Sequence, residues 1–300
     1  MTWDSFGAAR PLAALALAIT FGSPLGVAAQ AGPPVDGSGY RWDINFSTGA
    51  IGDGSGDAFD RWPGLCVTTN VALAPDAMCA FDREQYAVGS GATFTTVALG
   101  RGTEYRLEAV TLGMLNVSRR IWIPMSGVGF ARFAEIIENP GVADITFKVR
   151  VGSVNSSFNL GSDAATSVES TDRGGTAIGP GLFWLVTDDA STTDGDPAIA
   201  SVLDGPGRDA VRVVHRGPMP PFLSEDLLHW EYETVTLRPG ERAVYVHFIV
   251  QRDTAADAAA VAATLVRPAA EDLVGLAVFA ADLRNVFLGP PPNCGDGVLD

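Results

Sequence analysis

Histidine and cysteine are scarce in this chain, which holds three of each among 300 residues. The histidines, His215, His229 and His247, lie far apart, and no H-E-x-x-H or C-x-x-C spacing occurs. Zinc sites are usually built from such closely spaced ligand pairs. The sequence therefore disfavours a zinc centre, and we interpret the histidines as structural or surface residues of strands.

Motifs for nucleophilic and cofactor chemistry are also missing. The chain has no G-x-S-x-G turn of the kind that presents a nucleophilic serine. Its glycine-rich stretch "GDGSGD" is neither a phosphate-binding loop nor a full dinucleotide fingerprint. We predict no catalytic residues of these classes and no organic cofactor.

A long hydrophobic run occurs once, from Leu12 to Phe21, and it follows Arg10. This run has about ten residues, whereas a membrane-spanning helix needs roughly twenty. A basic residue, a short apolar run and the small residues Ala29 and Ala31 are typical of a secretory signal peptide, with cleavage fitting either alanine. We predict that residues 1–31 are this signal, that the mature chain has no transmembrane span, and that it is secreted or held at the cell surface.

Positive charge is sparse as well. The chain has 20 Lys and Arg, with Lys148 as its single lysine, against 35 Asp and Glu, for a net charge of −15. Such a charge repels a phosphate backbone, so we predict no nucleic acid partner. With 47% hydrophobic and 18% charged residues, the composition is that of a globular chain with a real core.

An odd number of cysteines in an exported chain leaves one without an internal partner. Cys66 and Cys79 are close in sequence, and we predict a disulfide between them, worth about 3 kcal/mol in the chain-entropy model. Cys294 then remains unpaired within the chain.

The last residues, "CGDGVLD" at 294–300, resemble the start of the cysteine-rich repeat that follows the main domain in many secreted myxobacterial proteins. The resemblance implies that the partner of Cys294 lies past Asp300. The run "GPPPNC" before it is typical of a stiff linker. Residues 289–300 are therefore predicted to be a Pro-rich linker and the truncated start of such a repeat.

Short β-type runs dominate the chain from Tyr40 onward. About a dozen runs rich in Val, Ile, Thr and aromatic residues are separated by turns such as "NPGVAD" and "LRPGER". This pattern predicts an all-β fold, a large antiparallel two-sheet β-sandwich over residues 40–288. Residues 32–39, rich in Gly and Pro, are predicted to be a disordered linker.

Two strands show how the faces are assigned. Between 143 and 151, apolar residues alternate with polar ones such as Lys148 and Arg150, so one face should be core and the other wet. Between 243 and 251 both faces are apolar or aromatic, which places this strand centrally in a sheet.

The hydrophobic period changes towards the end of the chain. Residues 253–266 are rich in alanine, with Asp253 or Thr254 as N-cap and Pro268 after the end, so they predict a helix. A second helical patch, interrupted by Gly275, spans residues 270–287. We expect both to pack at the edge of the sandwich as a short helical C-terminal cap.

Residues 40–266 also resemble an uncharacterised β-rich module of exported bacterial proteins. The resemblance is carried by "GDGSGDAFD", "RRIWIP", "FARFAEIIENP", "NLGSD" and "WLVTDD", in that order. It supports the β-rich fold and implies no activity.

Two acidic loops are candidates for calcium. The first offers Asp53, Asp57 and Asp60, and the second offers Asp188, Asp189, Asp194 and Asp196. Closely spaced carboxylates suit a hard cation, although Asp and Gly are also the ordinary residues of solvated turns. We name the first three as candidate metal ligands, with calcium as the only candidate cofactor.

Glycoside chemistry needs two suitably placed carboxylates and often an aromatic face for the sugar. Strand-associated candidates are Glu135, Glu138, Glu231 and Glu233, with Trp62, Trp122, Trp184 and Trp230. Isolated tryptophans in a sandwich usually belong to the core, which is our preferred interpretation.

The function we predict is that of an exported, non-catalytic module with a structural or adhesive role at the cell surface. The alternative is a carbohydrate-binding or carbohydrate-active β-sandwich of the mutarotase-like type. A glycan or another cell-surface molecule is the expected partner. An open concave sheet face with two exposed carboxylates and an exposed tryptophan would favour the alternative.

Overall fold

A computed structural model describes residues 32–52, 59–74, 77–89, 93–154, 159–160, 167–188, 196–205, 211–216 and 227–286. Its strands are β1 (Ile44–Asn45), β2 (Ala50–Ile51), β3 (Phe59–Asp60), β4 (Gly64–Thr68), β5 (Phe94–Leu99), β6 (Gly102–Leu107), β7 (Val110–Leu112), β8 (Leu115–Pro124), β9 (Ala131–Glu138), β10 (Ile145–Gly152), β11 (Asn159–Leu160), β12 (Ser167–Thr171), β13 (Trp184–Asp188), β14 (Ala198–Val202), β15 (Val211–Arg216), β16 (Leu228–Tyr232), β17 (Val235–Leu237) and β18 (Arg242–Arg252). Its helices are α1 (Phe81–Glu84), α2 (Ala255–Leu265) and the 3-10 turn η1 (Ala277–Phe279).

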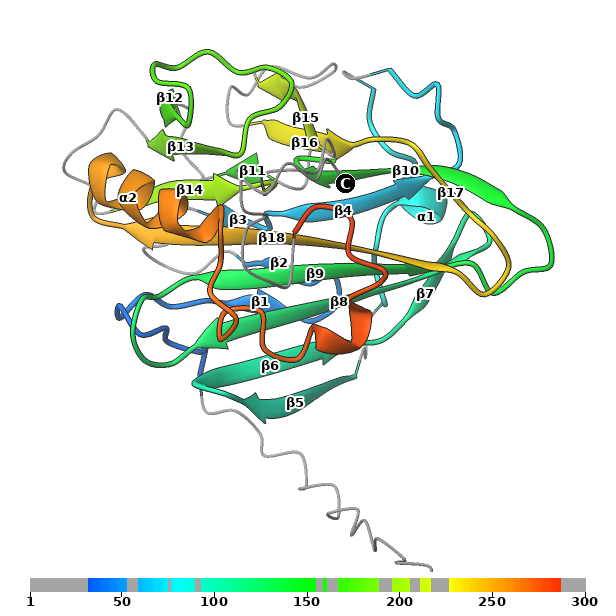
Figure 1. The fold of residues 1–300 in the computed structure, drawn as a ribbon, viewed down its shortest axis with the longest axis horizontal. Helices are drawn as coiled ribbons and strands as arrows, with labels where there is room; N and C mark the ends of the chain where they lie inside the picture. Colours follow the sequence, from blue (N-terminus) through cyan, green and yellow to red (C-terminus); the bar gives the residue numbers. More distant parts are fainter. Residues whose placement is uncertain are drawn as a thin grey trace, which may run out of the picture.

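Most of these strands form two antiparallel sheets. The larger, nine-stranded sheet runs in the order β12-β13-β14-β18-β9-β8-β6-β5, with β7 paired to β8. The smaller, five-stranded sheet runs in the order β15-β16-β10-β17, with β4 paired to β10. The predicted all-β sandwich is therefore confirmed, and Figure 1 shows its arrangement.

The main core contains residues from both of these sheets. One face of β8, β9 and β18 packs against one face of β4, β10 and β16, as period-two alternation requires. The fully buried residues of this layer include Val117, Ile121, Phe133, Ile137, Phe147, Val149, Val151, Trp230 and Ile249. This is the apolar layer that the alternating sequence pattern predicts.

A second core lies on the opposite face of the large sheet. There Val244, Val246 and Phe248 of β18 pack with Ala258, Ala262 and Leu265 of α2 and with residues of the C-terminal segment 266–286. Figure 1 shows α2 and this orange-to-red segment crossing in front of the large sheet. The central strands of the large sheet are therefore covered on both faces.

Helix α2 begins where the sequence predicts. Thr254 is its N-cap, and the Thr254 hydroxyl accepts a hydrogen bond from the backbone N–H of Asp257. The helix contacts β13, β14 and β18, so it covers a sheet face. The expected position at the sandwich edge is wrong, because the outer face of these central strands is itself apolar and needs a cover.

The second predicted helix is reduced to a single 3-10 turn, η1. Gly275 adopts the left-handed conformation with φ of +80°, which an α-helix does not accommodate. Leu273, Leu276 and Leu283 are still buried against the sheet. The segment thus keeps the predicted apolar contacts as an irregular strap.

The strand predicted to be central is indeed central. β18 pairs with β14 on one side and β9 on the other, and its residues from Ala243 to Gln251 are all buried. It joins the two halves of the large sheet.

Residues 32–39, predicted to be a disordered linker, are hydrogen-bonded to the sandwich. The Asp36 carboxylate accepts hydrogen bonds from the backbone N–H groups of Ser38 and Tyr40 and from the indole of Trp42, at 2.8, 3.1 and 3.0 Å. Gly37 N–H donates to the carbonyl of Pro124 at the end of β8.

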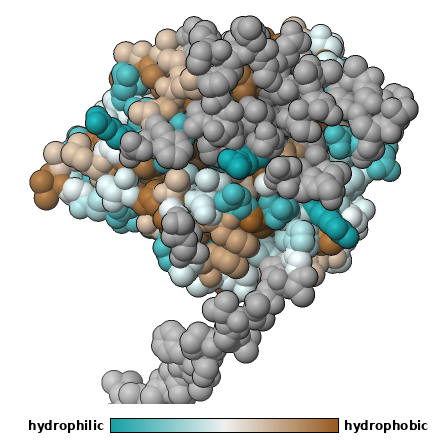
Figure 2. Space-filling view, turned by 180° about the vertical axis from the view of Figure 1, so that it is seen from behind, coloured by the Kyte–Doolittle hydropathy of each residue, from teal (hydrophilic) through white to brown (hydrophobic). Residues whose placement is uncertain are grey.

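The predicted signal peptide, residues 1–31, and the predicted linker and repeat start, residues 289–300, lie outside the described residues. Within the described ranges, no helix combines the length and apolar character that crossing a bilayer requires. Figure 2 views the molecule from behind, where hydrophilic and hydrophobic residues are interspersed over the described surface.

Candidate functional site

An ionic network lies in the middle of the main core. Arg119 of β8 and Glu135 of β9 are directly opposite each other in the antiparallel register, and His247 of β18 reaches the same carboxylate. Strand alternation directs all three side chains to the face that packs on the smaller sheet. All three are fully buried, which is unusual for charged residues unless they are paired.

The geometry of this network is close. The Arg119 guanidinium donates to Glu135 from Nε at 3.0 Å and from Nη2 at 2.7 Å, and His247 Nε2 lies 2.9 Å from Glu135 Oε1. The remaining nitrogen, Nη1 of Arg119, donates to the carbonyl oxygens of Gly49 and Pro63, both at 2.8 Å. Arg119 therefore ties two loops to the centre of the sheet.

Aromatic rings hold the imidazole in place. His247 is stacked on Phe133, with ring centroids 4.8 Å apart, and meets the edge of Trp230 at 5.5 Å. The Phe133 ring also lies under the Arg119 guanidinium, at 5.2 Å. These contacts fix the orientations of the His247 imidazole and the Arg119 guanidinium.

The protonation states follow from burial and pairing. Burial raises the pKa of Glu135, but the charge of Arg119 and the hydrogen bond from His247 outweigh it, so the pKa lies below its usual value. Burial lowers the pKa of His247, and the Glu135 carboxylate only partly offsets this. At neutral pH we therefore assign an ionised Glu135 and a neutral His247 that donates from Nε2.

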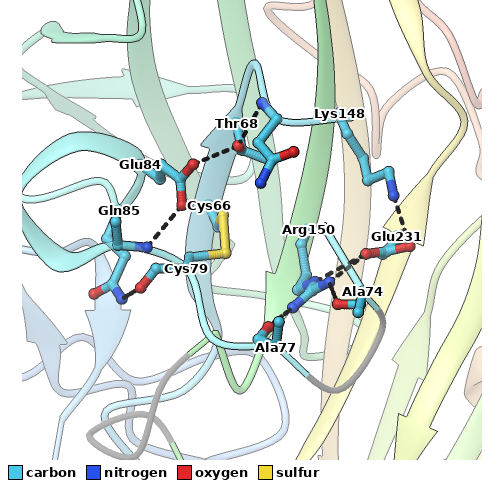
Figure 3. Close-up of a disulfide and its surroundings, with 12 residues drawn as sticks. Cys66, Thr68, Ala74, Ala77, Cys79, Glu84, Gln85, Lys148, Arg150 and Glu231 are labelled. Carbon is cyan, nitrogen blue, oxygen red and sulfur yellow. Dashed lines mark hydrogen bonds and ion pairs between the residues drawn. A yellow bond between two sulfur atoms is a disulfide. The ribbon is translucent and has the colours of Figure 1, made fainter. Parts of the chain in front are cut away.

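A second ion pair lies on the other face of the smaller sheet. The Glu231 carboxylate of β16 pairs with Arg150 of β10 through Nε at 3.1 Å and through Nη2, and with Lys148 Nζ at 3.5 Å. The Arg150 guanidinium also donates to the carbonyl oxygens of Ala74, at 3.0 Å, and Ala77. Figure 3 shows these contacts.

This arrangement corrects the expectation of a wet face on β10. Arg150 is only 1% exposed, because the chain around Ala74 and Ala77 folds over it. Thr146 remains exposed, as predicted. The polar face is thus wet at one end of the strand and covered at the other.

The predicted disulfide, Cys66–Cys79, is present in the structure and closes the loop that covers Arg150. Glu84 braces the same loop, since its carboxylate accepts from the Thr68 hydroxyl at 2.5 Å and from the Ala80 backbone N–H at 2.7 Å. The two sulfurs and Glu84 lie close enough to share a metal ion. Because the sulfurs are bonded to each other, they are not thiolate ligands here.

Most of the candidate calcium ligands cannot be placed. Asp53, Asp57, Asp189 and Asp194 lie outside the described residues, as does Cys294. Asp60 is in β3, Asp188 ends β13, and Asp196 is half-buried just before β14. Calcium binding therefore stays a prediction.

The four candidate carboxylates do not converge. Glu135 points into the core between the sheets, while Glu231 points away from it, because its neighbours Trp230 and Tyr232 belong to that core. Glu138 is half-buried and Glu233 is exposed. The smaller sheet thus separates the two strand-centre carboxylates.

The candidate tryptophans are mostly core residues. Trp62, Trp122 and Trp230 are fully buried, and only Trp184 is half-buried. His229 is also fully buried, and His215 is in β15. The preferred interpretation of these tryptophans as core is confirmed for three of the four.

Sequence reasoning missed the arginine partners. Arg119 and Arg150 carry the ion pairs of Glu135 and Glu231, yet neither is singled out by a motif. The available signal was a basic residue on the apolar face of a strand, as with Arg119 between Val117 and Ile121. The strand pairing that brings Arg119 to Glu135 cannot be read from the local sequence.

Neither a protein-family model nor a curated protein matches this chain. Similar solved structures include one described as a kojibiose phosphorylase from the human microbiome, with 13% identity, a TM-score of 0.36, and coverage of 67% of this chain and 24% of that one. Another is a polysaccharide lyase with 19% identity, a TM-score of 0.34, and coverage of 76% of this chain and 33% of that one. This chain spans a third or less of either protein, and likeness at these scores supports no transfer of their activities.

Proposed function

We propose that this chain is an exported, non-catalytic β-sandwich module with a structural or adhesive role at the cell surface. The observation that carries the proposal is the covering of the central strands of the large sheet on both faces, by the smaller sheet and by α2 with the C-terminal segment. A filled sheet face offers rigidity and leaves the loops and edges of the module for contacts with other molecules.

The placement of the acids supports the non-catalytic part of the proposal. A glycosidase needs two carboxylates on either side of one bond, about 5 to 10 Å apart. Here the buried candidates Glu135 and Glu231 lie on opposite sides of the smaller sheet, and each is held by an arginine. Both acids serve the packing of the sandwich.

The disulfide supports the exported part. Cys66–Cys79 lies in the smaller sheet and its covering loop, and disulfides persist mainly in oxidising compartments outside the cytosol. It agrees with a signal peptide over residues 1–31, which remains a proposal.

Carbohydrate binding is the second candidate. One observation favours it: Trp184 of β13 is half-buried, so part of its indole is accessible to a flat sugar face. The partner would then be a glycan of the cell surface, while the charge of −15 still argues against nucleic acid.

The full chain produced in a secreting bacterial host tests both proposals. We expect a mature N-terminus at residue 30 or 32 by mass spectrometry, labelling of intact cells by an antibody against the chain, and no release of reducing sugar from polysaccharides. An uncleaved N-terminus with no surface labelling contradicts export. Saturable binding on a glycan array that is lost in Trp184→Ala establishes the carbohydrate alternative.

A further inference from the structure

A cluster of arginines surrounds one buried carboxylate on the outer face of the large sheet. Glu104 of β6 is fully buried and contacts Arg106 Nε at 2.7 Å, Arg120 Nη1 at 3.6 Å and Arg132 Nη2 at 3.0 Å. One negative charge thus faces three positive charges.

Arg132 is the structural member of this cluster. Its side chain is fully buried, and its Nη1 donates to the backbone carbonyls of Asp272 at 3.0 Å and Val274 at 2.8 Å, which fastens the C-terminal segment to the sheet. Its guanidinium also lies over the Trp122 ring at 5.1 Å. Arg132 Nη2 and Glu104 Oε2 are therefore already paired with each other.

Arg106 and Arg120 are in a different position. They are directly opposite each other on β6 and β8, an arrangement in which like charges are unfavourable. Their side chains are 39% and 22% exposed. Among the described residues, Arg106 donates only through Nε, and Arg120 makes no hydrogen bond through its guanidinium.

The Arg120 guanidinium is nevertheless held in place. It lies over the Phe279 ring of η1 at 4.8 Å, and Arg242 lies over the same ring at 5.0 Å. Burial lowers the pKa of Arg120; the charge of Glu104 opposes this, and the charges of Arg106 and Arg242 act in the same direction as burial. Two neighbouring acids are engaged elsewhere, Asp272 with Arg101 at 2.7 Å and Asp282 with Arg242 at 3.2 Å.

The edge side of the arginine pair is open to solvent. Along the row that crosses the sheet, Arg106 is followed on this side by Thr95 of β5, which is exposed, whereas Arg120 is followed on the other side by Ala134 of β9, which is buried. Both neighbours are small, and the Thr95 hydroxyl adds a hydrogen-bond donor. Two guanidinium groups with unused N–H donors, together with a hydroxyl, are the donors that a carboxylate or sulfate group requires.

We propose that Arg106 and Arg120 together bind one oxyanion, a carboxylate or sulfate group, on the outer face of the large sheet, with Thr95 as a further donor. The anion restores the charge balance that Glu104 alone leaves incomplete. Because the whole chain is strongly acidic, the site suits a single oxyanion on a small or short ligand better than a long polyanion. The site does not depend on the structural role proposed above.

Isothermal titration calorimetry of the full chain with sodium sulfate, trigalacturonate and the neutral maltotriose tests this site. We expect saturable binding of at least one of the two anions and none of maltotriose. Arg106→Gln and Arg120→Gln should each weaken anion binding by roughly tenfold or more, as loss of a charged hydrogen-bond donor implies. Tighter binding of trigalacturonate than of sulfate identifies an acidic sugar, and equal or tighter sulfate identifies a free inorganic oxyanion.

Arg238→Gln is the matched control, because it removes the same charge from an exposed turn position. Its anion affinity should stay within about twofold of the wild type, since long-range charge effects are screened. Circular dichroism shows whether each variant is folded. If Arg120→Gln does not fold, the anion affinities of Arg106→Gln and Arg106→Lys, at the more exposed position, test the site. Binding of neither anion, or equal binding by Arg106→Gln and the wild type, overturns the proposal.

Discussion

Arg119 and Glu135 face each other across β8 and β9 with three charged hydrogen bonds at the centre of the main core, while the same guanidinium donates to the carbonyls of Gly49 and Pro63. The pair therefore links the strands to the loops that close the sandwich. Removing either partner leaves the other charge buried and unpaired, which is costly in any protein interior.

The first prediction concerns this pair. Glu135→Gln should lower the free energy of unfolding by roughly 3 to 5 kcal/mol, because Arg119 then remains buried without its counter-ion. Urea unfolding followed by tryptophan fluorescence measures the change. Glu233→Gln, an equivalent change at an exposed residue, should stay within about 0.5 kcal/mol. Equal effects of the two substitutions would contradict the assigned role of Glu135.

The second prediction is a pH dependence from His247. Its folded pKa is below the unfolded value of 6.5, mainly because of burial, so the unfolded chain binds the proton more readily. Stability should be full above about pH 6.5 and fall as the pH drops through the folded pKa, with a limiting slope of about 1.4 kcal/mol per pH unit for one proton. The lowered pKa of Glu135 adds a further loss at more acidic pH.

Thermal melts of the wild type and of His247→Gln between pH 5 and 8 measure this slope. The variant is less stable throughout, but its melting temperature should vary less between pH 5.5 and 6.5. A variant with the wild-type slope would show that another group carries the proton uptake.

The third prediction concerns the disulfide. The double variant Cys66→Ala/Cys79→Ala should be less stable by about 3 kcal/mol, the chain-entropy value for a loop of this size, in which the two cysteines are 13 residues apart. Differential scanning calorimetry measures the loss. A reducing agent should lower the melting temperature of the wild type and leave that of the double variant unchanged. A reductant-insensitive wild type would mean that the bond does not form.

The fourth prediction tests the close packing of the smaller sheet. At Gly152, with φ of +111°, a Cβ would lie 2.4 Å from the carbonyl oxygen of Leu228, whereas Gly174, with φ of +76°, has open space. Gly174→Ala should cost about 1 to 2 kcal/mol from backbone strain alone. Gly152→Ala should cost about 1 to 3 kcal/mol more, because backbone atoms must move apart. Chemical denaturation compares them, and equal losses would contradict the contact.

The fifth prediction is calcium binding through Asp53, Asp57 and Asp60. Calcium should raise the melting temperature of the full chain, and a chelator should lower it. The triple variant with Asn at these positions should lose the response. A melt that neither calcium nor chelator changes removes the calcium proposal.

The sequence predicts the sandwich well because alternation is a local property. The apolar positions of β10, from Ile145 to Val151, and the doubly buried character of β18 are visible without knowing any partner strand. The capped helix α2 and the disulfide are also short-range features. These were the parts of the fold that could be predicted.

The ion pairs could not be predicted, because they depend on long-range pairing. Arg150 meets Glu231, 81 residues further on, and is covered by a loop closed by Cys66 and Cys79. Glu104 meets Arg132 only after β6, β8 and β9 have been aligned. A local sequence pattern predicts that such charged residues face solvent, because it does not show which distant segment packs over them.

The late position of β18 has a consequence for synthesis. Until residues 242–252 have left the ribosome, β9 and β14 have no common neighbour, and each presents an unpaired edge. Between the synthesis of β14, which ends at Val202, and that of β18, the nascent chain therefore holds two incomplete half-sheets and cannot finish folding. A shortened product that ends before this strand should aggregate, because the edges of β9 and β14 then stay unpaired.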